Sequence, residues 1–302
     1  MILGEINLKS AKTVAIRSRC GQCHRDERRV NMTTLYDTHA HLDYEDFNPD
    51  LVQVVERAAA AGITRIISIG TDLESSRRAI QLAERFPGVF AAVGWHPCHA
   101  FEAPEDFRPM LRELARHRKV VAIGETGLDF HHLPSGKPGG TADDDVRYKQ
   151  KQTATFRQQM QVAAELGLNC IVHQRDALED VLAEMRPFED AVRGVFHCFV
   201  NNASDMKRVI ATGSLVSFTG IVTFKNAQSV RDTVLATPLD RFMLETDCPY
   251  LAPMPYRGKR CEPAYVKEIA DLVAEVKGCP LAEIGRVTCE NAAKFFPKLP
   301  PA

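Results

Sequence analysis

Eight short apolar or β-branched runs alternate with segments of helical spacing along most of this chain, and this alternation limits the fold more than any other feature. Eight strand and helix units predict an α/β fold in which a parallel sheet closes into a (β/α)8 TIM barrel with right-handed crossovers. An open doubly wound sheet is the structural alternative. The predicted strands are Leu35–Tyr36, Ile63–Ile69, Val89–Val93, Val120–Ile123, Cys170–Val172, Gly194–Phe196, Leu215–Phe218 and Phe242–Leu244.

The length and composition suit one barrel domain. The chain has 302 residues, and a barrel of this kind takes about 250. Hydrophobic residues make up 45% and charged residues 25%, the balance of an ordinary globular protein. Two last helices, about Pro263–Val276 and Leu281–Phe296, are expected to complete the outer layer. We therefore predict a single domain over residues 32–302.

Residues 1–31 differ from the rest, since they are basic and show little apolar periodicity. We expect a disordered basic leader or an over-extended start, with Met32 as the true first residue. The segment holds Cys20-Gly-Gln-Cys23-His24, the pattern of covalent haem attachment. Haem attachment requires export and no export signal is visible, so a metal-binding or redox pair at Cys20 and Cys23 is the functional alternative.

Charge and cysteine content exclude several classes of protein. The net charge of −1 gives no basic surface of the kind that coats nucleic acid, so a bound polyanion would depend on metal ions and a local patch. The sequence lacks both a signal peptide and an apolar run of 18 residues, which predicts a cytoplasmic protein without a membrane partner. The nine cysteines are an odd number scattered along the chain, and we expect reduced thiols.

The first strand is followed by a possible chelate. His39 and His41 lie two residues apart in Asp37-Thr-His-Ala-His-Leu-Asp43. Residues two apart on a strand point to the same face, so both imidazoles can reach one ion. One half-buried face of a strand is the alternative explanation for this pair.

Further candidate ligands follow the later strands, and the carboxyl ends of barrel strands meet at one mouth. Four imidazoles and two carboxylates exceed the needs of one tetrahedral ion and suit two divalent ions with a bridging carboxylate. Nitrogen and oxygen ligands together favour Zn, Mn, Fe, Co or Ni over Ca, with Mg as a poorer match. Taken singly, His173 could be a core histidine and Asp247 a turn residue. The predicted metal ligands are His39, His41, Glu125, His173, His197 and Asp247.

His96 and a long loop complete the predicted mouth. His96, in Gly94-Trp-His-Pro97, has three alternative roles: metal ligand, phosphate contact, or packed neighbour of Trp95. Residues His131–Asp145 are rich in glycine, proline and polar residues that cannot support a core. Because they follow the strand that leads to Glu125, they form either a cover over the mouth or a plain surface insertion.

Several motifs together resemble the TatD family of metal-dependent hydrolases and deoxyribonucleases. The resemblance covers about Leu35 to Phe296. It implies a TIM barrel of the amidohydrolase type, a dinuclear site, and phosphodiester hydrolysis on DNA, commonly as a 3′-5′ exonuclease. The motifs are Asp37-Thr-His-Ala-His-Leu-Asp43, Gly94-Trp-His-Pro97, Gly124-Glu-Thr-Gly-Leu-Asp129, His173-Gln-Arg-Asp-Ala177, His197-Cys-Phe199, Leu244-Glu-Thr-Asp-Cys-Pro-Tyr-Leu-Ala-Pro253 and Arg257-Gly-Lys-Arg260.

The resemblance also implies how the ligands divide between the ions. One ion would have His39, His41, Glu125 and Asp247, and the other Glu125, His173 and His197, with Glu125 bridging. The chain departs from the family pattern at Phe130-His131-His132 and the glycine-rich insertion, at Val200-Asn-Asn202, and at Cys261, where asparagine is frequent. No departure removes a proposed ligand, but together they bear on substrate preference.

The expected mechanism is attack of metal-activated water on phosphorus, with two divalent ions (Mg, Mn or Zn) as cofactors. Asp247 is the expected general base and Glu125 the second choice, because a bridging carboxylate has less freedom to accept a proton. DNA strand ends are the expected substrate, and we expect a monomer. Predicted substrate contacts, for which a solvated charge run is the alternative, are His96, Arg175, Arg257, Lys259 and Arg260.

Two other functions share these features. An amidohydrolase or D-aminoacyl-tRNA deacylase would use the same site to deliver hydroxide to a carbonyl group. A structural metal-binding protein without activity is the non-enzymatic alternative. Structural sites are usually closed and rich in thiolates, which a histidine and carboxylate site is not.

Overall fold

The structure is a computed structural model that describes residue 1 and residues 32–300. The predicted leader, with its Cys20, Cys23 and His24 motif, lies outside the described residues. Among the described residues, none of the helices combines the length and apolar character that crossing a membrane requires.

Within residues 32–300, eight parallel strands pair in chain order from β1 to β8. A single parallel bridge between Ala40 and Cys248 joins β1 to the segment after β8, so the barrel is nearly closed. The predicted TIM barrel is confirmed. The strands are β1 (Leu35–Ala40), β2 (Ile63–Ile69), β3 (Val89–Val93), β4 (Val120–Asp129), β5 (Cys170–Arg175), β6 (Gly194–Phe196), β7 (Leu215–Phe218) and β8 (Phe242–Leu244).

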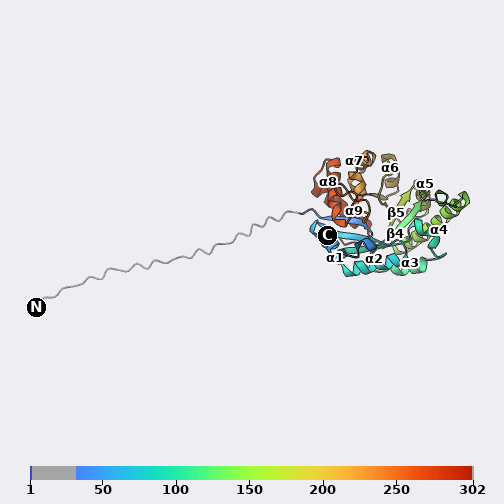
Figure 1. Ribbon diagram of the computed structural model, residues 1–302, viewed down its shortest axis with the longest axis horizontal. Coiled ribbons are helices and arrows are strands. Elements are labelled where there is room, and N and C mark those ends of the chain that lie inside the picture. The colour runs from blue at the N-terminus through green and yellow to red at the C-terminus, as the bar shows by residue number, and fades with distance from the viewer. Residues whose placement is uncertain (2–31, 301–302) are drawn as a thin grey trace. The chain divides into compact units, whose positions relative to one another are not determined.

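Helices surround the strands, and in Figure 1 the labelled strands β4 and β5 lie inside the labelled helices. Short 3-10 turns join several units, among them η2 (Pro97–Glu102), η3 (Pro134–Gly136) and η7 (Pro263–Tyr265). The α-helices are α1 (Leu51–Ala60), α2 (Leu73–Arg85), α3 (Arg108–Ala115), α4 (Ala142–Leu166), α5 (Leu178–Met185), α6 (Ala203–Ala211), α7 (Gln228–Ala236), α8 (Val266–Lys277) and α9 (Leu281–Phe295).

Five strands have the predicted bounds, whereas β1, β4 and β5 extend beyond them. The prediction ended each of these three where polar residues begin. The polar side chains of β1 and β4 are buried at the barrel mouth, and strand pairing continues past the apolar run. His39, Glu125 and His173 therefore lie within strands and not after them.

The loop predicted over His131–Asp145 is shorter than expected, because α4 already begins at Ala142. Thr141 accepts a hydrogen bond from the Asp144 backbone N–H, and the Asp144 side chain accepts one from the Thr141 backbone, which is a capping box. The loop starts at the mouth, where the backbone N–H groups of His131 and His132 donate to Asp129 Oδ1 at 3.0 and 2.9 Å.

An apolar filling inside the barrel supports the mouth. His173 comes two residues after Ile171 of this filling, and His197 two residues after Val195. Residues two apart in an extended strand point to the same side, so both imidazoles lie above the filling. The filling takes residues from all eight strands: Tyr36, Ile67, Ile69, Phe90, Ala92, Val121, Ala122, Ile171, Val195, Leu215 and Met243.

Candidate metal centre

The six predicted ligands come together at the mouth in two groups. In the first group, His39 Nε2 lies 3.3 Å from His41 Nε2 and 3.6 Å from Asp247 Oδ1. His41 Nε2 lies 3.4 Å from the same Asp247 oxygen. Both imidazoles are buried. We call His39, His41 and Asp247 the first half of the cluster.

In the second group, Glu125 Oε1 lies 2.8 Å from His197 Nε2 and 3.0 Å from His173 Nδ1. The two imidazole nitrogens are 3.2 Å apart. We call His173 and His197 the second half. Glu125 reaches both halves, because its Oε2 lies 3.5 Å from His39 Nε2 and 3.8 Å from His41 Nε2.

Two further carboxylates lie behind the imidazoles of the second half, and the sequence prediction missed both. Asp129 Oδ2 lies 3.1 Å from His173 Nε2, so a proton on that nitrogen leaves the Nδ1 lone pair directed toward Glu125. Glu245 Oε1 lies 3.7 Å from His197 Nδ1. Glu245 is itself held by a 2.6 Å hydrogen bond from the Cys198 backbone N–H and one of 2.6 Å from Ser217 Oγ. Both acids stand in motifs already quoted, and their positions two to four residues from a ligand were the available signal.

Asp37 connects the start and the end of the barrel beside the first half. Its carboxylate accepts hydrogen bonds from the Thr246 backbone N–H at 2.9 Å and from Thr246 Oγ1 at 2.6 Å. The next residue, Asp247, has a φ of 58°, and its N–H donates to the carbonyl of His39 at 2.9 Å. This positive φ turns the Asp247 carboxylate toward the two imidazoles. Burial raises the pKa of Asp37 to about 8, against its hydrogen bonds from Thr246.

The proton affinities follow from this crowding. Burial opposes ionisation of Glu125, but the electrostatic interaction with His197 and the hydrogen bonds from His173 and His197 hold its pKa well below its usual value. Burial also opposes charge on His197, yet Glu125 and Glu245 raise the pKa of this imidazole well above its usual value. Burial also opposes ionisation of Asp247, yet a hydrogen bond donated by His41 lowers the pKa of this carboxyl group.

The residues present fit divalent metal ions. The imidazole nitrogens of His39 and His41 are 3.3 Å apart, and those of His173 and His197 are 3.2 Å apart. A shared proton can join the two nitrogens of only one such pair. A cation accepts lone pairs from all of these nitrogens and from the carboxylates between them. Imidazole with carboxylate is a donor set that zinc and its neighbours in the first transition row take.

His96 lies beside the second half. Its Nε2 is 3.3 Å from Glu125 Oε1 and 3.3 Å from His173 Nδ1. Its Nδ1 accepts a hydrogen bond of 3.1 Å from the Cys98 backbone N–H. Burial lowers the pKa of His96 to about 4, so the ring is neutral and carries its proton on Nε2. This tautomer favours a hydrogen-bond donor over a metal ligand.

The predicted basic contacts lie in two places. Arg175, exposed at the end of β5, lines a cavity of about 470 Å³ together with Gln174 and Asn201. Arg257 and Lys259 are exposed in the segment after β8, and the Arg257 guanidinium lies 3.6 Å from the ring centroid of Phe224. Arg260 is held by Asp50 at 2.8 and 2.9 Å and by the carbonyl of Asp46 at 2.6 Å.

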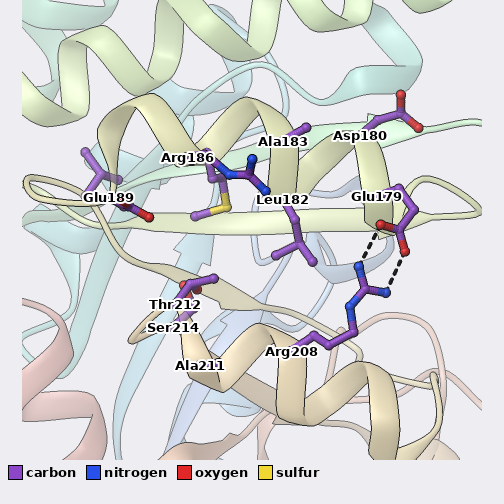
Figure 2. A pocket seen from close by; sticks show the side chains of 12 residues that line it. Glu179, Asp180, Leu182, Ala183, Arg186, Glu189, Arg208, Ala211, Thr212 and Ser214 are labelled. Carbon is purple, nitrogen blue, oxygen red and sulfur yellow. Dashed lines mark hydrogen bonds and ion pairs between the residues drawn. The ribbon is translucent and has the colours of Figure 1, made fainter.

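A larger cavity, of about 590 Å³, lies between α5 and α6 and contains none of the cluster residues. Arg208 reaches across it from α6 to form an ion pair with Glu179 at 2.5 and 2.6 Å, as Figure 2 shows. Its lining combines apolar side chains such as Leu182 with this ion pair. Its lining residues include no histidine, so this cavity lacks the imidazole ligands found at the mouth.

Similarity to known proteins extends along almost the whole described chain. A family model described as "TatD related DNase" matches residues 36–297. The uncharacterized metal-dependent hydrolase YabD of Bacillus subtilis is 41% identical over 263 residues, which are 87% of this chain and 98% of that protein. A protein of Erwinia billingiae named 3′-5′ ssDNA/RNA exonuclease TatD is 34% identical over 269 residues, 87% of this chain and 98% of that protein. The crystal structure of YJJV, a TatD homologue from Escherichia coli K12, has a TM-score of 0.79 and 26% identity and covers 89% of this chain and 100% of its own.

Proposed function

Because this chain belongs to the TatD family of metal-dependent hydrolases, which act on ester bonds, we propose that it cleaves DNA phosphodiester bonds from strand ends as a 3′-5′ exodeoxyribonuclease. The position of Glu125 between two groups of imidazoles carries the proposal. The name of the Erwinia billingiae relative supports it, and extends the substrates worth testing to RNA.

The proposal includes two divalent ions, Mg, Mn or Zn. His39, His41, Asp247 and Glu125 would hold one, and Glu125, His173 and His197 the other. The ions, when bound, supply Lewis acidity toward the phosphate and a water of lowered pKa. The chain itself positions the scissile phosphate, excludes other water and moves the proton.

Asp247 is the proposed general base. Its Oδ1 lies 3.4–3.6 Å from the two imidazoles of the first half, and its side chain is 15% exposed, so it can meet a water that enters from the mouth. Glu125 is 3% exposed and both of its oxygens contact imidazoles. The geometry thus supports Asp247 over Glu125 as the group that accepts the proton of the attacking water.

His96 and Arg175 are proposed to bind the phosphates. The neutral His96 ring, fixed through its Nδ1, offers its Nε2–H to a non-bridging oxygen at the reacting phosphate. Arg175 lines the neighbouring cavity after β5, where the next phosphate of the strand fits. Arg257 and Lys259 remain proposed contacts. Arg260 instead holds the segment after β8 on the N-terminus of α1, and a phosphate role would require it to release Asp50.

An aromatic track leads from the first half to the solvent. Tyr44 stacks on His41 with ring centroids 4.8 Å apart, and Tyr250 meets Tyr44 edge-on at 6.1 Å. Tyr250 is 56% exposed. An exposed tyrosine at this place suits stacking on a nucleobase of any sequence, which is how strand ends are held without sequence preference.

The test is cleavage of single-stranded DNA labelled at the 3′ or the 5′ end, with an RNA of the same sequence beside it. The chain is freed of metal with a chelator and then supplied with Mg, Mn or Zn. We expect mononucleotides that depend on added metal, released from the 3′ end.

Intact DNA and RNA with every metal, while two equivalents of metal are bound, would contradict the proposal. Amides and esters, including D-aminoacyl-tRNA, would then be the substrates to test, since the same site can direct water at a carbonyl carbon. The monomeric state and the cytoplasmic location stay predictions.

A further inference from the structure

A second set of metal-ligating atoms adjoins the cluster and is not used by the proposed function. Asp129, the last residue of β4, is 1% exposed. Besides His173 Nε2, its Oδ2 meets His132 Nδ1 at 2.9 Å and Cys98 Sγ at 3.7 Å. The ligand atoms of Cys98, Asp129 and His132 all lie within 4.8 Å of one another.

The three residues come from separate segments that the barrel brings together. Cys98 belongs to η2, which follows β3, while Asp129 ends β4 and His132 lies in the loop that follows. Two backbone N–H groups of this loop, from His131 and His132, are bound to Asp129 Oδ1 and fix where the His132 ring lies. The site is thus built by the fold and not by one flexible segment.

The three side chains offer sulfur, nitrogen and oxygen atoms, a combination that hydrogen bonding of one carboxylate does not require. A thiol is a weak hydrogen-bond donor, so the 3.7 Å contact from Cys98 Sγ adds little to a carboxylate that His132 and two backbone N–H groups already hold. Sulfur, imidazole and carboxylate together are ligands that zinc accepts at about 2.0–2.3 Å, which places ligand atoms roughly 3–4 Å apart. The distances of 2.9 and 3.7 Å fall close to that range.

We propose that Cys98, Asp129 and His132 form a third metal site, for a zinc-type divalent ion, beside the two-ion cluster. Binding forms a bond to Cys98 Sγ and releases the thiol proton to solvent, while His132 ligates through Nδ1 and keeps its proton on Nε2. The His132 side chain is 50% exposed, so the fourth position opens to water at the mouth.

The position of the site gives it a specific consequence. Asp129 would ligate the third ion and accept the hydrogen bond from His173 Nε2 at 3.1 Å, so the ion would fix the orientation of His173 as well. His132 lies in the segment Phe130-His131-His132, where the chain departs from the pattern of the family it resembles.

The test is metal stoichiometry of the full-length chain, reconstituted with zinc and freed of loosely bound metal by gel filtration. Cys98→Ser and His132→Gln are each expected to bind one equivalent less than the unsubstituted chain. Cys279→Ser, which removes a partly buried thiol elsewhere, is the matched control and should retain every equivalent. A double variant, Cys20→Ser with Cys23→Ser, shows whether any of the counted ions is bound by these two cysteines near the N-terminus.

Cobalt supplies a second measurement that does not depend on counting ions. A thiolate ligand gives cobalt a near-ultraviolet charge-transfer band, which we expect in the unsubstituted chain and in Cys279→Ser but not in Cys98→Ser. Equal stoichiometry in Cys98→Ser and the unsubstituted chain would overturn the proposal, as would a band lost only in the Cys20 and Cys23 double variant. Because neither measurement uses DNA, the site stands or falls separately from the nuclease activity.

Discussion

The two halves of the cluster are built from similar ligands but supported in different ways. In the second half, each imidazole has a carboxylate behind it, Asp129 for His173 and Glu245 for His197. The Nδ1 atoms of His39 and His41, like that of His197, have no hydrogen-bond partner among the described residues, but only His197 has a carboxylate within 4 Å of this atom. The second half is therefore supported by the hydrogen bond between His173 and Asp129 and by the charge of Glu245, whereas the first half depends on the strand itself.

This difference predicts that the two proposed ions respond differently to substitution. Removal of a carboxylate from behind an imidazole should weaken the ion of the second half alone. The imidazoles of the first half have no carboxylate behind them, so the affinity for its ion can be lowered only by substitution of its ligands or of Glu125.

The largest effect is expected for Glu125→Gln, because the two carboxylate oxygens of Glu125 lie within 4 Å of imidazole nitrogens in both halves. Loss of the bridging charge should weaken both ions and cost several kcal/mol of transition-state stabilisation, or about three to four orders of magnitude in kcat. Turnover and bound metal are measured on the same sample, with circular dichroism as the control for folding. Retention of both ions at normal affinity would contradict the bridging position.

Glu245→Gln should separate the two halves. It removes the charge that faces His197 Nδ1 and leaves His39 and His41 untouched. Loss of such a supporting carboxylate typically lowers metal affinity by about 10–100-fold. Titration with a competing chelator should show one ion weakened and the other unchanged. Equal weakening of both ions would mean that the halves are not supported independently.

The pH dependence of stability should reverse when metal is bound. Although burial opposes it, Asp129 and Glu125 raise the pKa of His173, as Glu125 raises that of His197. Each protonated imidazole stabilises the metal-free chain fully below its unfolded pKa of about 6.5, and this contribution is lost as pH rises through the folded pKa. Metal competes with these protons, so the loaded chain should gain stability over the same rise.

Urea unfolding at pH 6 and pH 8.5, in chelator or in zinc, measures both slopes. The free energy of unfolding should fall with pH in chelator and rise in zinc. His197→Gln, which removes the imidazole whose pKa is raised well above its usual value, should flatten the slope in chelator. Parallel slopes with and without zinc would show that these imidazoles do not hold the ion.

The barrel could be predicted from the sequence because its signal is repeated eight times. The gathering of the six candidate ligands at the mouth followed, since the mouth of a barrel brings together the residues at the carboxyl ends of its strands. Asp129 and Glu245 could not be assigned, because their roles depend on which nitrogen of His173 and His197 faces inward, and this is a property of side-chain orientation. Arg260 was expected to bind phosphate because it is charged. In the structure its guanidinium donates a hydrogen bond to Asp50, a contact that depends on how distant segments pack.

The smallest effect concerns the rim, where the two halves again differ. Tyr250 connects through Tyr44 to His41 of the first half, whereas Arg175 is the last residue of β5, the strand that carries His173 of the second half. Stacking of one base is worth about 1–3 kcal/mol, so Tyr250→Ala should raise KM for single-stranded DNA roughly tenfold with kcat little changed. Tyr250→Phe keeps the ring and should behave as the unsubstituted chain does. An equal rise in KM in both variants would mean that the hydroxyl group and not the ring contacts the strand. A fall in kcat alone would mean that Tyr250 acts in the chemical step at the first half and not in the binding of bases.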